Sequence, residues 1–126
     1  MAELRAHGGR TASGQVLVIL AMTGAKTGRT HNKPVCVRED GPDLIIAASA
    51  GGQPAHPQWY RNLVAHPELT AEYLGQVFPV LAATVPNSPD RDRLFHLMSE
   101  EITGLYSYQD KCRDTRQIPV IRLSRS

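Results

Sequence analysis

Cysteine is scarce in this chain, and its two cysteines, Cys36 and Cys112, lie far apart without a CxxC pair. A disulfide framework needs several cysteines, and a zinc knuckle needs closely spaced pairs of them. The sequence therefore predicts neither a disulfide scaffold nor a metal site. Reduced thiols are typical of the cytoplasm, which is where we expect this protein to be.

Long apolar stretches are also missing, since the longest run, Val16 to Met22, has seven residues. A membrane-spanning helix needs roughly twenty apolar residues. No charged and then apolar signal segment opens the chain. We therefore expect neither stable membrane insertion nor export.

A large excess of charge of one sign is absent as well. The chain has 14 basic and 12 acidic residues, a net charge of +2. Nucleic-acid binders present a strongly basic surface, so this balance predicts no nucleic-acid partner. A basic binding site would have to be local.

What remains is a chain of 126 residues, 41% of them apolar, which suffices for one hydrophobic core. Residues 1–14 are small, polar and rich in glycine, and this composition predicts a flexible N-terminal leader. Residues 15–126 are therefore expected to form a single domain.

Apolar and alternating patterns predict about six strands and two main helices. Turn clusters at 40–42 and 75–76 join neighbouring strands into hairpins, and Pro79 suggests an edge strand. The second helix should leave Arg91 off its apolar face. The fold class is therefore α+β, a small antiparallel β-barrel. The strands are expected at 16–22, 34–39, 43–49, 69–74, 76–85 and 118–123, and the helices at 57–65 and 89–102.

The loop from Thr23 to Lys33 concentrates groups that bind anions. Its sequence, TGAKTGRTHNK, contains two glycines and four side chains that are or can become cationic. Backbone amides and cations together form a cradle for phosphate or carboxylate. The glycines are four apart with the lysine between them, which excludes a Walker loop. Composition alone leaves open that the loop is only a solvated connection.

A second segment, AASAGGQPAHPQWYRNL, joins a strand end, a Gly-Gly break and a helix. Glycines at 51 and 52 permit close approach of the backbone to a ligand. Trp59 and Asn62 would give a flat ring one apolar wall and one hydrogen-bonding edge. An ordinary core position for Trp59 remains an equal alternative.

The order of these motifs resembles the deazaflavin-dependent nitroreductase family over Val16 to Leu123. The motifs are T-G-x-K-[ST]-G, a strand starting at Pro34, A-S-x-G-G, H-P-x-W-Y-x-N-L, Y-Q-D and I-P-V. The string from His56 to Leu63 is the most specific of them.

The resemblance implies an FMN-binding-like split β-barrel that binds coenzyme F420, a deazaflavin with a phosphate and an oligoglutamate tail. The implied activity is an F420H2-dependent oxidoreductase that transfers hydride to quinones, nitroaromatics or activated enones. FMN is a less favoured cofactor, because the loop suits a long anionic appendage. The sequence leaves open whether the protein is a monomer or a homodimer.

Matching the motifs position by position also implies roles for individual residues. Ser49 and Tyr108 would be substrate-side catalytic groups, because their hydroxyls can hydrogen-bond or protonate a reduced oxygen. The cofactor-binding positions would be Lys26, Thr27, Arg29, His31 and Lys33 for the phosphate and tail, Pro34, Val35, Cys36, Ala48, Ser49 and Ala50 along the ring, and Trp59 and Asn62 from the helix.

Several positions depart from the family pattern. Ala25, His31 and Ala50 stand where relatives usually carry stronger cations, and Lys111 stands where a tyrosine is common. Each charge-assisted bond to phosphate contributes roughly 1.5 to 3 kcal/mol, so these departures predict weaker F420 binding unless Arg29 and Lys33 compensate. The alternative function is a non-catalytic carrier or sensor that binds a hydrophobic or acidic ligand in the same barrel.

Overall fold

The computed structural model describes residues 16–125. The predicted leader, residues 1–14, lies outside the described residues. In chain order the elements are β1 (Leu17–Thr23), β2 (Thr30–Cys36), β3 (Arg38–Asp40), β4 (Asp43–Ala47), η1 (Ala50–Gly52), α2 (Gln58–Ala65), β5 (Glu68–Tyr73), β6 (Gln76–Thr84), α3 (Pro89–Ser99), α4 (Leu105–Cys112) and β7 (Val120–Arg125).

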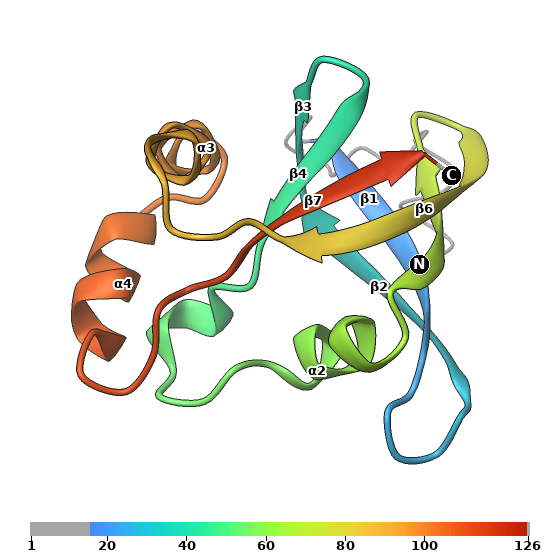
Figure 1. Cartoon of the computed structure of the whole chain (residues 1–126), viewed down its shortest axis with the longest axis horizontal. Coiled ribbons are helices and arrows are strands. Elements are labelled where there is room, and N and C mark those ends of the chain that lie inside the picture. The colour runs from blue at the N-terminus through green and yellow to red at the C-terminus, as the bar shows by residue number, and fades with distance from the viewer. Residues whose placement is uncertain (1–15, 126) are drawn as a thin grey trace.

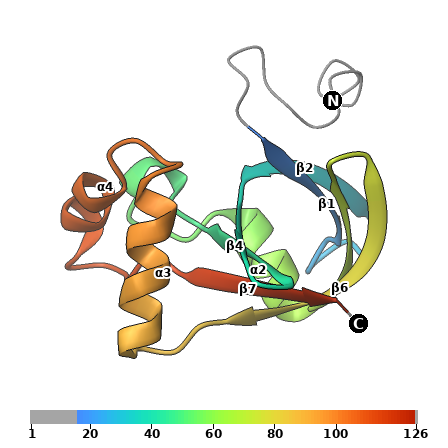
Figure 2. The same cartoon turned by 90° about the horizontal axis from the view of Figure 1, so that it is seen from above.

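The strands form one seven-stranded antiparallel sheet in the order β2-β1-β5-β6-β7-β4-β3. Its two edge strands, β2 and β3, are consecutive in the chain and separated only by Val37. The sheet therefore curls until its edges meet, as the view from above shows (Figures 1 and 2). This half-barrel confirms the predicted α+β, split-barrel class, with seven strands where about six were expected.

The predicted strand 34–39 is divided in two by the curl. Its first half belongs to β2, where Val35 lies opposite Val18 of β1. Its second half is β3, which pairs with β4 through the expected turn at 40–42. Val37, only 4% exposed, points into the core at the division. The alternation of apolar and polar residues does not show where a strand changes its pairing partner. The sequence therefore predicts the two halves as one continuous strand.

Strand β4 separates two hydrophobic cores. Leu44 and Ile46 point into the curl, whereas Ile45 and Ala47 point toward α3 and α4. Successive side chains of a strand face opposite sides, so a strand with a core on each side must be apolar throughout. This explains the unbroken apolar run at 44–47.

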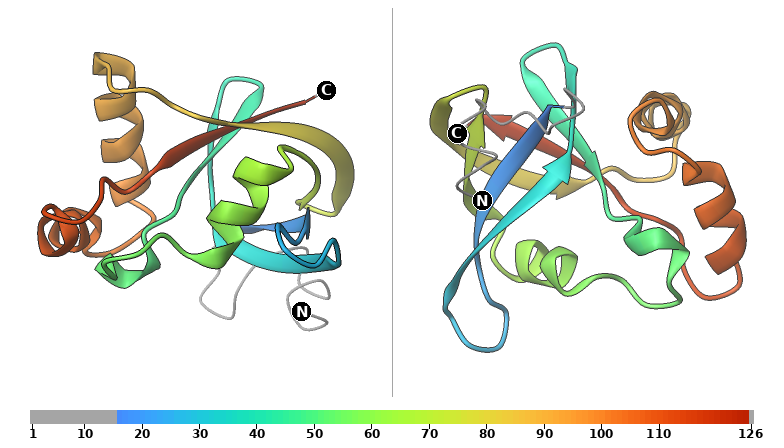
Figure 3. Two further views of the ribbon diagram at one scale, coloured as in Figure 1. Left: turned by 60° about the horizontal axis from the view of Figure 1, so that its bottom comes forward. Right: turned by 180° about the vertical axis from the view of Figure 1, so that it is seen from behind.

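The helices occupy two places on the sheet. Helix α2 lies across one mouth of the curl, α3 lies beside β4 and β7, and α4 packs against η1 and α3 (Figure 3). Helix α4 was not predicted, because its only buried residues are Leu105 and Cys112 and its N-cap, Gly104, makes no side-chain cap. None of the helices in the described part of the chain is long and apolar enough to cross a bilayer.

Two local predictions were wrong. Strand β6 lies between β5 and β7, so Pro79 is not on an edge strand. Among the described residues, β6 pairs with β7 only from Val80 onward. The missing N–H of Pro79 therefore leaves no gap in the hydrogen bonds between β6 and β7. Arg91 is buried, with 6% exposure, because it lies three and four residues before Leu94 and Phe95 on the buried face of α3, where its guanidinium donates to the carbonyl of Ile118.

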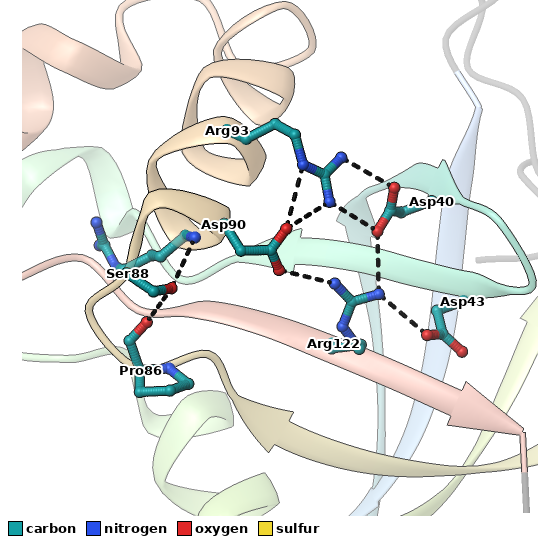
Figure 4. Close-up of polar contacts among 8 residues, drawn as sticks. Asp40, Asp43, Pro86, Ser88, Asp90, Arg93 and Arg122 are labelled. Atoms are coloured by element: carbon teal, nitrogen blue, oxygen red, sulfur yellow. Dashed lines mark hydrogen bonds and ion pairs between the residues drawn. The ribbon is translucent and has the colours of Figure 1, made fainter.

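An ion-pair network joins the β3–β4 hairpin to α3 and β7 (Figure 4). Asp40 accepts hydrogen bonds from Arg93 at 3.0 and 3.2 Å and from Arg122 at 3.0 Å. Arg122 also donates to Asp43 at 3.0 Å and to Asp90 at 3.3 Å. The hydrogen bonds from Arg93, and then those from Arg122, hold the pKa of Asp40 below its ordinary value, against the opposing effect of partial burial.

We predict that Asp40→Asn lowers the free energy of unfolding at pH 7 by about 1 kcal/mol, because a partly exposed network is screened by solvent. The pKa of Asp40 is lower in the folded state than in the unfolded state. Its contribution is therefore complete above about pH 5 and is lost as the pH falls through the folded pKa. Urea unfolding at pH 7 and at acidic pH measures both effects.

The matched control is Asp110→Asn, which removes a carboxylate that is 73% exposed and that pairs, among residues 16–125, only with Arg113. This variant should unfold like the wild-type protein at both pH values. An Asp40→Asn variant with unchanged stability at pH 7 would show that the network does not stabilise the hairpin.

Candidate functional site

The turn between β1 and β2, residues 24–29, is closed by its own backbone. The Gly24 N–H donates to the Arg29 carbonyl at 2.7 Å, and the Gly28 N–H donates to the Gly24 carbonyl at 3.0 Å. Gly28 has a φ of 70°, which glycine adopts without strain. These bonds leave the N–H groups of Lys26 and Thr27 without an acceptor among residues 16–125. The turn therefore presents backbone donors beside a lysine.

Asn62 attaches this turn to α2. Its Oδ1 accepts from the Ala25 N–H at 3.0 Å and from Gln58 Nε2 at 3.1 Å. The side chain is only 5% exposed, and its Nδ2 takes no part in these two bonds. The position of the turn therefore depends on a polar residue of the helix, 37 residues away in sequence.

A cleft of about 640 Å³ lies between the turn, β2 and α2, and we call it the turn cleft. Its size is within the usual range for small-molecule sites, roughly 300–1,000 Å³. Met22 and Trp59 give it apolar surface. Six of the residues predicted to bind the cofactor line it, namely Lys26, Thr27, His31, Lys33, Trp59 and Asn62.

Strand β2 begins earlier than predicted and brings two of these groups to the cleft. The expected loop extended to Lys33, but Thr30 already pairs with Thr23 in the β1–β2 ladder. His31 and Lys33 are two positions apart in the strand, so they lie on one face of it. Their placement is therefore fixed by strand register and not by a flexible loop.

The other predicted cofactor contacts in and beside β2 lie outside the turn cleft. Arg29 is exposed at the end of the turn and does not line the cleft. Val35 packs against the core inside the curl, and Cys36 packs against the core under α3 and α4. Pro34 is half-buried opposite Ile19. Their predicted contact with a cofactor ring stays a prediction.

The segment after β4 follows an irregular path. Ala48 is fully buried, and its N–H donates to the Pro119 carbonyl at 3.0 Å, so this amide is not free for a ligand. Ala50 has a φ of 47°, a left-handed conformation that a residue with a Cβ rarely adopts. Ser49 and Ala50 are partly exposed but do not line the turn cleft.

Arg116 holds this irregular segment in place. Its guanidinium donates to the carbonyls of Ala48 at 2.9 Å, Ser49 at 2.6 Å and Gln53 at 2.9 Å. It also donates to Nδ1 of His56 at 3.1 Å. Burial, and then the positive charge of Arg116, lower the pKa of His56, which favours the neutral ring that accepts this bond.

Sequence reasoning missed Arg116. It lies in a polar stretch without periodicity, and nothing in the local pattern distinguishes it from Arg113, which is exposed. Its role depends on acceptors more than 60 residues away. No signal in a single sequence identifies such a partner set.

Tyr108 is placed beside η1 by a close backbone contact. A Cβ on Gly52 would lie 2.8 Å from the Tyr108 carbonyl oxygen, so only glycine permits this approach. The Tyr108 ring extends toward Gly104 at the start of α4. Neither Tyr108 nor Ser49 lines the turn cleft, and their catalytic roles stay predictions.

Comparison with known proteins identifies the family. The model of the F420H(2)-dependent quinone reductase family matches residues 1–124. The chain belongs to this family. An F420H(2)-dependent quinone reductase of Mycobacterium tuberculosis strain H37Rv is 37% identical over 86% of this chain and 72% of that protein. A putative quinone reductase of the same family and strain is 33% identical over 84% and 87%, respectively.

Solved structures agree with the family assignment. An F420-H2 dependent reductase, FDR-A, superposes with a TM-score of 0.75 at 30% identity, covering 86% of this chain and 93% of that one. A structure described as a domain-swapped dimer has a TM-score of 0.76 at 29% identity, covering 98% and 94%. A putative pyridoxamine 5'-phosphate oxidase from Listeria innocua, at 14% identity and a TM-score of 0.62, shares the fold alone. The predicted family, its oxidoreductase class and the split-barrel fold are therefore confirmed.

The turn cleft of this quinone reductase family member fits the cofactor that the family uses. The backbone N–H groups of Lys26 and Thr27, which have no acceptor among residues 16–125, and the ammonium groups of Lys26 and Lys33 form a donor set for phosphate or carboxylate oxygens. Trp59 supplies an aromatic surface in the same cleft. An anionic tail and a flat ring are the two features of F420 that such a cleft suits.

We predict that Arg116→Lys lowers the free energy of unfolding by about 2 to 3 kcal/mol. A single ammonium cannot reach four acceptors at once, and a buried carbonyl without a donor is costly. Urea unfolding at pH 7 measures the change.

The control is Arg113→Lys, which makes the same exchange at an exposed arginine of the same segment and should change the stability little. Equal stabilities for the two variants would contradict the role assigned to Arg116.

Proposed function

We propose that this chain binds F420H2 in the turn cleft and uses it to reduce quinones, with other electron-poor molecules such as nitroaromatics and enones as further substrates. The observation that carries the proposal is the meeting of a cationic rim, two free backbone donors and Trp59 in one cleft of a family member.

In this proposal the residues of the cleft bind and orient the cofactor. Lys26, Lys33 and the free N–H groups of the turn hold the phosphate and the acidic tail. Asn62 keeps the turn at the correct distance from α2, because its Oδ1 holds the Ala25 N–H. F420H2, when bound, supplies the hydride, and the protein needs no nucleophile of its own.

The substrate side is assigned to the segment around η1. A quinone that accepts a hydride gains negative charge on oxygen, and a hydroxyl donor lowers the cost of that charge. Ser49 and Tyr108 are the hydroxyls proposed for this role. The close contact between Gly52 and Tyr108, and the hydrogen bond from Arg116 to the Ser49 carbonyl, support a fixed geometry of this segment.

The direct test is titration of the purified protein with F420, followed by the fluorescence of the deazaflavin. The proposal expects saturable quenching with a dissociation constant on the order of tens of micromolar or lower. Oxidation of F420H2 in the presence of menadione then measures quinone reduction. Absence of quenching would overturn the proposal, and binding without turnover would leave only a carrier role.

We predict that the double variant Lys26→Ala/Lys33→Ala raises the dissociation constant for F420 at least about tenfold, because two charge-assisted contacts to the anionic tail are lost. The control is Arg61→Ala, which removes an exposed cation of α2 that does not line the cleft. Its dissociation constant should match that of the wild-type protein. An unchanged double variant would place the tail elsewhere.

A further inference from the structure

A second cleft, of about 560 Å³, lies between α3, α4 and the segment that leads to β7, and we call it the helix cleft. It is lined by residues from all three elements, including Arg91, Phe95, Tyr106, Arg113 and Arg116. The turn cleft shares none of these residues. The two helices that form it stand away from the β1–β2 turn (Figure 1).

Arg91 carries a buried positive charge that forms no salt bridge among the described residues, although the charge of Asp92 acts on it and its guanidinium lies 5.3 Å from the centroid of the Phe95 ring. Its one side-chain hydrogen bond runs from Nη2 to the Ile118 carbonyl. No fully buried side-chain nitrogen or oxygen among residues 16–125 lacks a partner, so a guanidinium nitrogen of Arg91 that makes no hydrogen bond keeps some accessible surface, and Arg91 is one of the residues that line the cleft. A nearly buried guanidinium that lines a cleft and makes one hydrogen bond in the described chain is an anion-binding feature.

The charged groups around the helix cleft favour a ligand with a single negative charge. Three guanidinium groups, of Arg91, Arg113 and Arg116, surround it. Two carboxylates oppose them, since Asp92 lines the cleft and Asp110 pairs with Arg113 at 3.1 Å. One net positive charge remains, which suits a monoanion better than a phosphate or a dianion.

An aromatic wall completes the cleft. Phe95 and Tyr106 are packed edge to face, with ring centroids 5.0 Å apart and an interplanar angle of 69°. Tyr106 is 53% exposed, yet its hydroxyl lies 3.2 Å from Nδ1 of His96, so two contacts fix the ring. An exposed aromatic ring whose orientation is already fixed can stack against another flat ring with little loss of side-chain entropy.

We infer that the helix cleft is a second ligand site, which takes a flat aromatic monoanion of the aryl carboxylate class. The carboxylate would contact Arg91 and Arg113, and the ring would lie against Phe95 and Tyr106. The site is separate from the turn cleft and does not depend on the proposed cofactor binding.

The probe is 2-naphthoate, compared with 2-naphthamide, which has nearly the same shape and no charge. Calorimetry gives the dissociation constants, and ¹H–¹⁵N NMR titration locates the site. Naphthoate should bind saturably, at least about tenfold more tightly than the amide, with shifts in α3 and α4. Equal affinity for the two probes, or no saturable binding of naphthoate at millimolar concentration, would overturn the inference.

Variants assign the contacts. Arg113→Gln and Tyr106→Ala change exposed residues, so they should fold, and each should weaken naphthoate binding at least about fivefold. Arg91→Lys keeps the charge but loses the fork of donors, and it should weaken binding similarly.

The controls Arg61→Gln and Lys26→Ala/Lys33→Ala should leave naphthoate binding unchanged. Weakening by the lysine variant, without weakening by Arg113→Gln and Tyr106→Ala, would place naphthoate in the turn cleft and overturn the inference.

Discussion

Burial of β4 on both of its faces is the constraint on which the remaining structure depends. One face closes the core of the curled sheet, and the other supports α3 and α4. The strand must therefore be apolar at every position from Leu44 to Ala47, and a helix layer must cover its outer side. The ion pair of Asp40 with Arg93 of α3 then holds the β3–β4 hairpin against that layer, and Arg122 of β7 joins the same network.

Two polar side chains connect this frame to the functional segments. Asn62 ties the β1–β2 turn to α2, and Arg116 ties the irregular segment after β4 to the end of the helix layer. Both are buried, and each forms hydrogen bonds with backbone atoms of a distant segment. Such contacts position a segment that lacks secondary structure of its own, because each unpaired buried group would be costly.

The fold places two clefts of different character at different parts of the molecule. The turn cleft has lysines, free backbone donors and Trp59, a set that suits a long anionic cofactor. The helix cleft has guanidinium groups and a fixed Tyr106, a set that suits a smaller aromatic anion. Because no lining residue is common to both clefts, binding in one can be altered without direct damage to the other.

The sequence by itself determined the family, the split-barrel class and most strands, because local patterns and motif order carry that information. It also selected six residues that line the turn cleft, Lys26, Thr27, His31, Lys33, Trp59 and Asn62. Only the tertiary structure decided that Val37 divides one apparent strand and that Arg91 is buried. Only the tertiary structure also decided which groups accept hydrogen bonds from Arg116. The reason is that strand partners and buried polar contacts depend on residues far away in the chain.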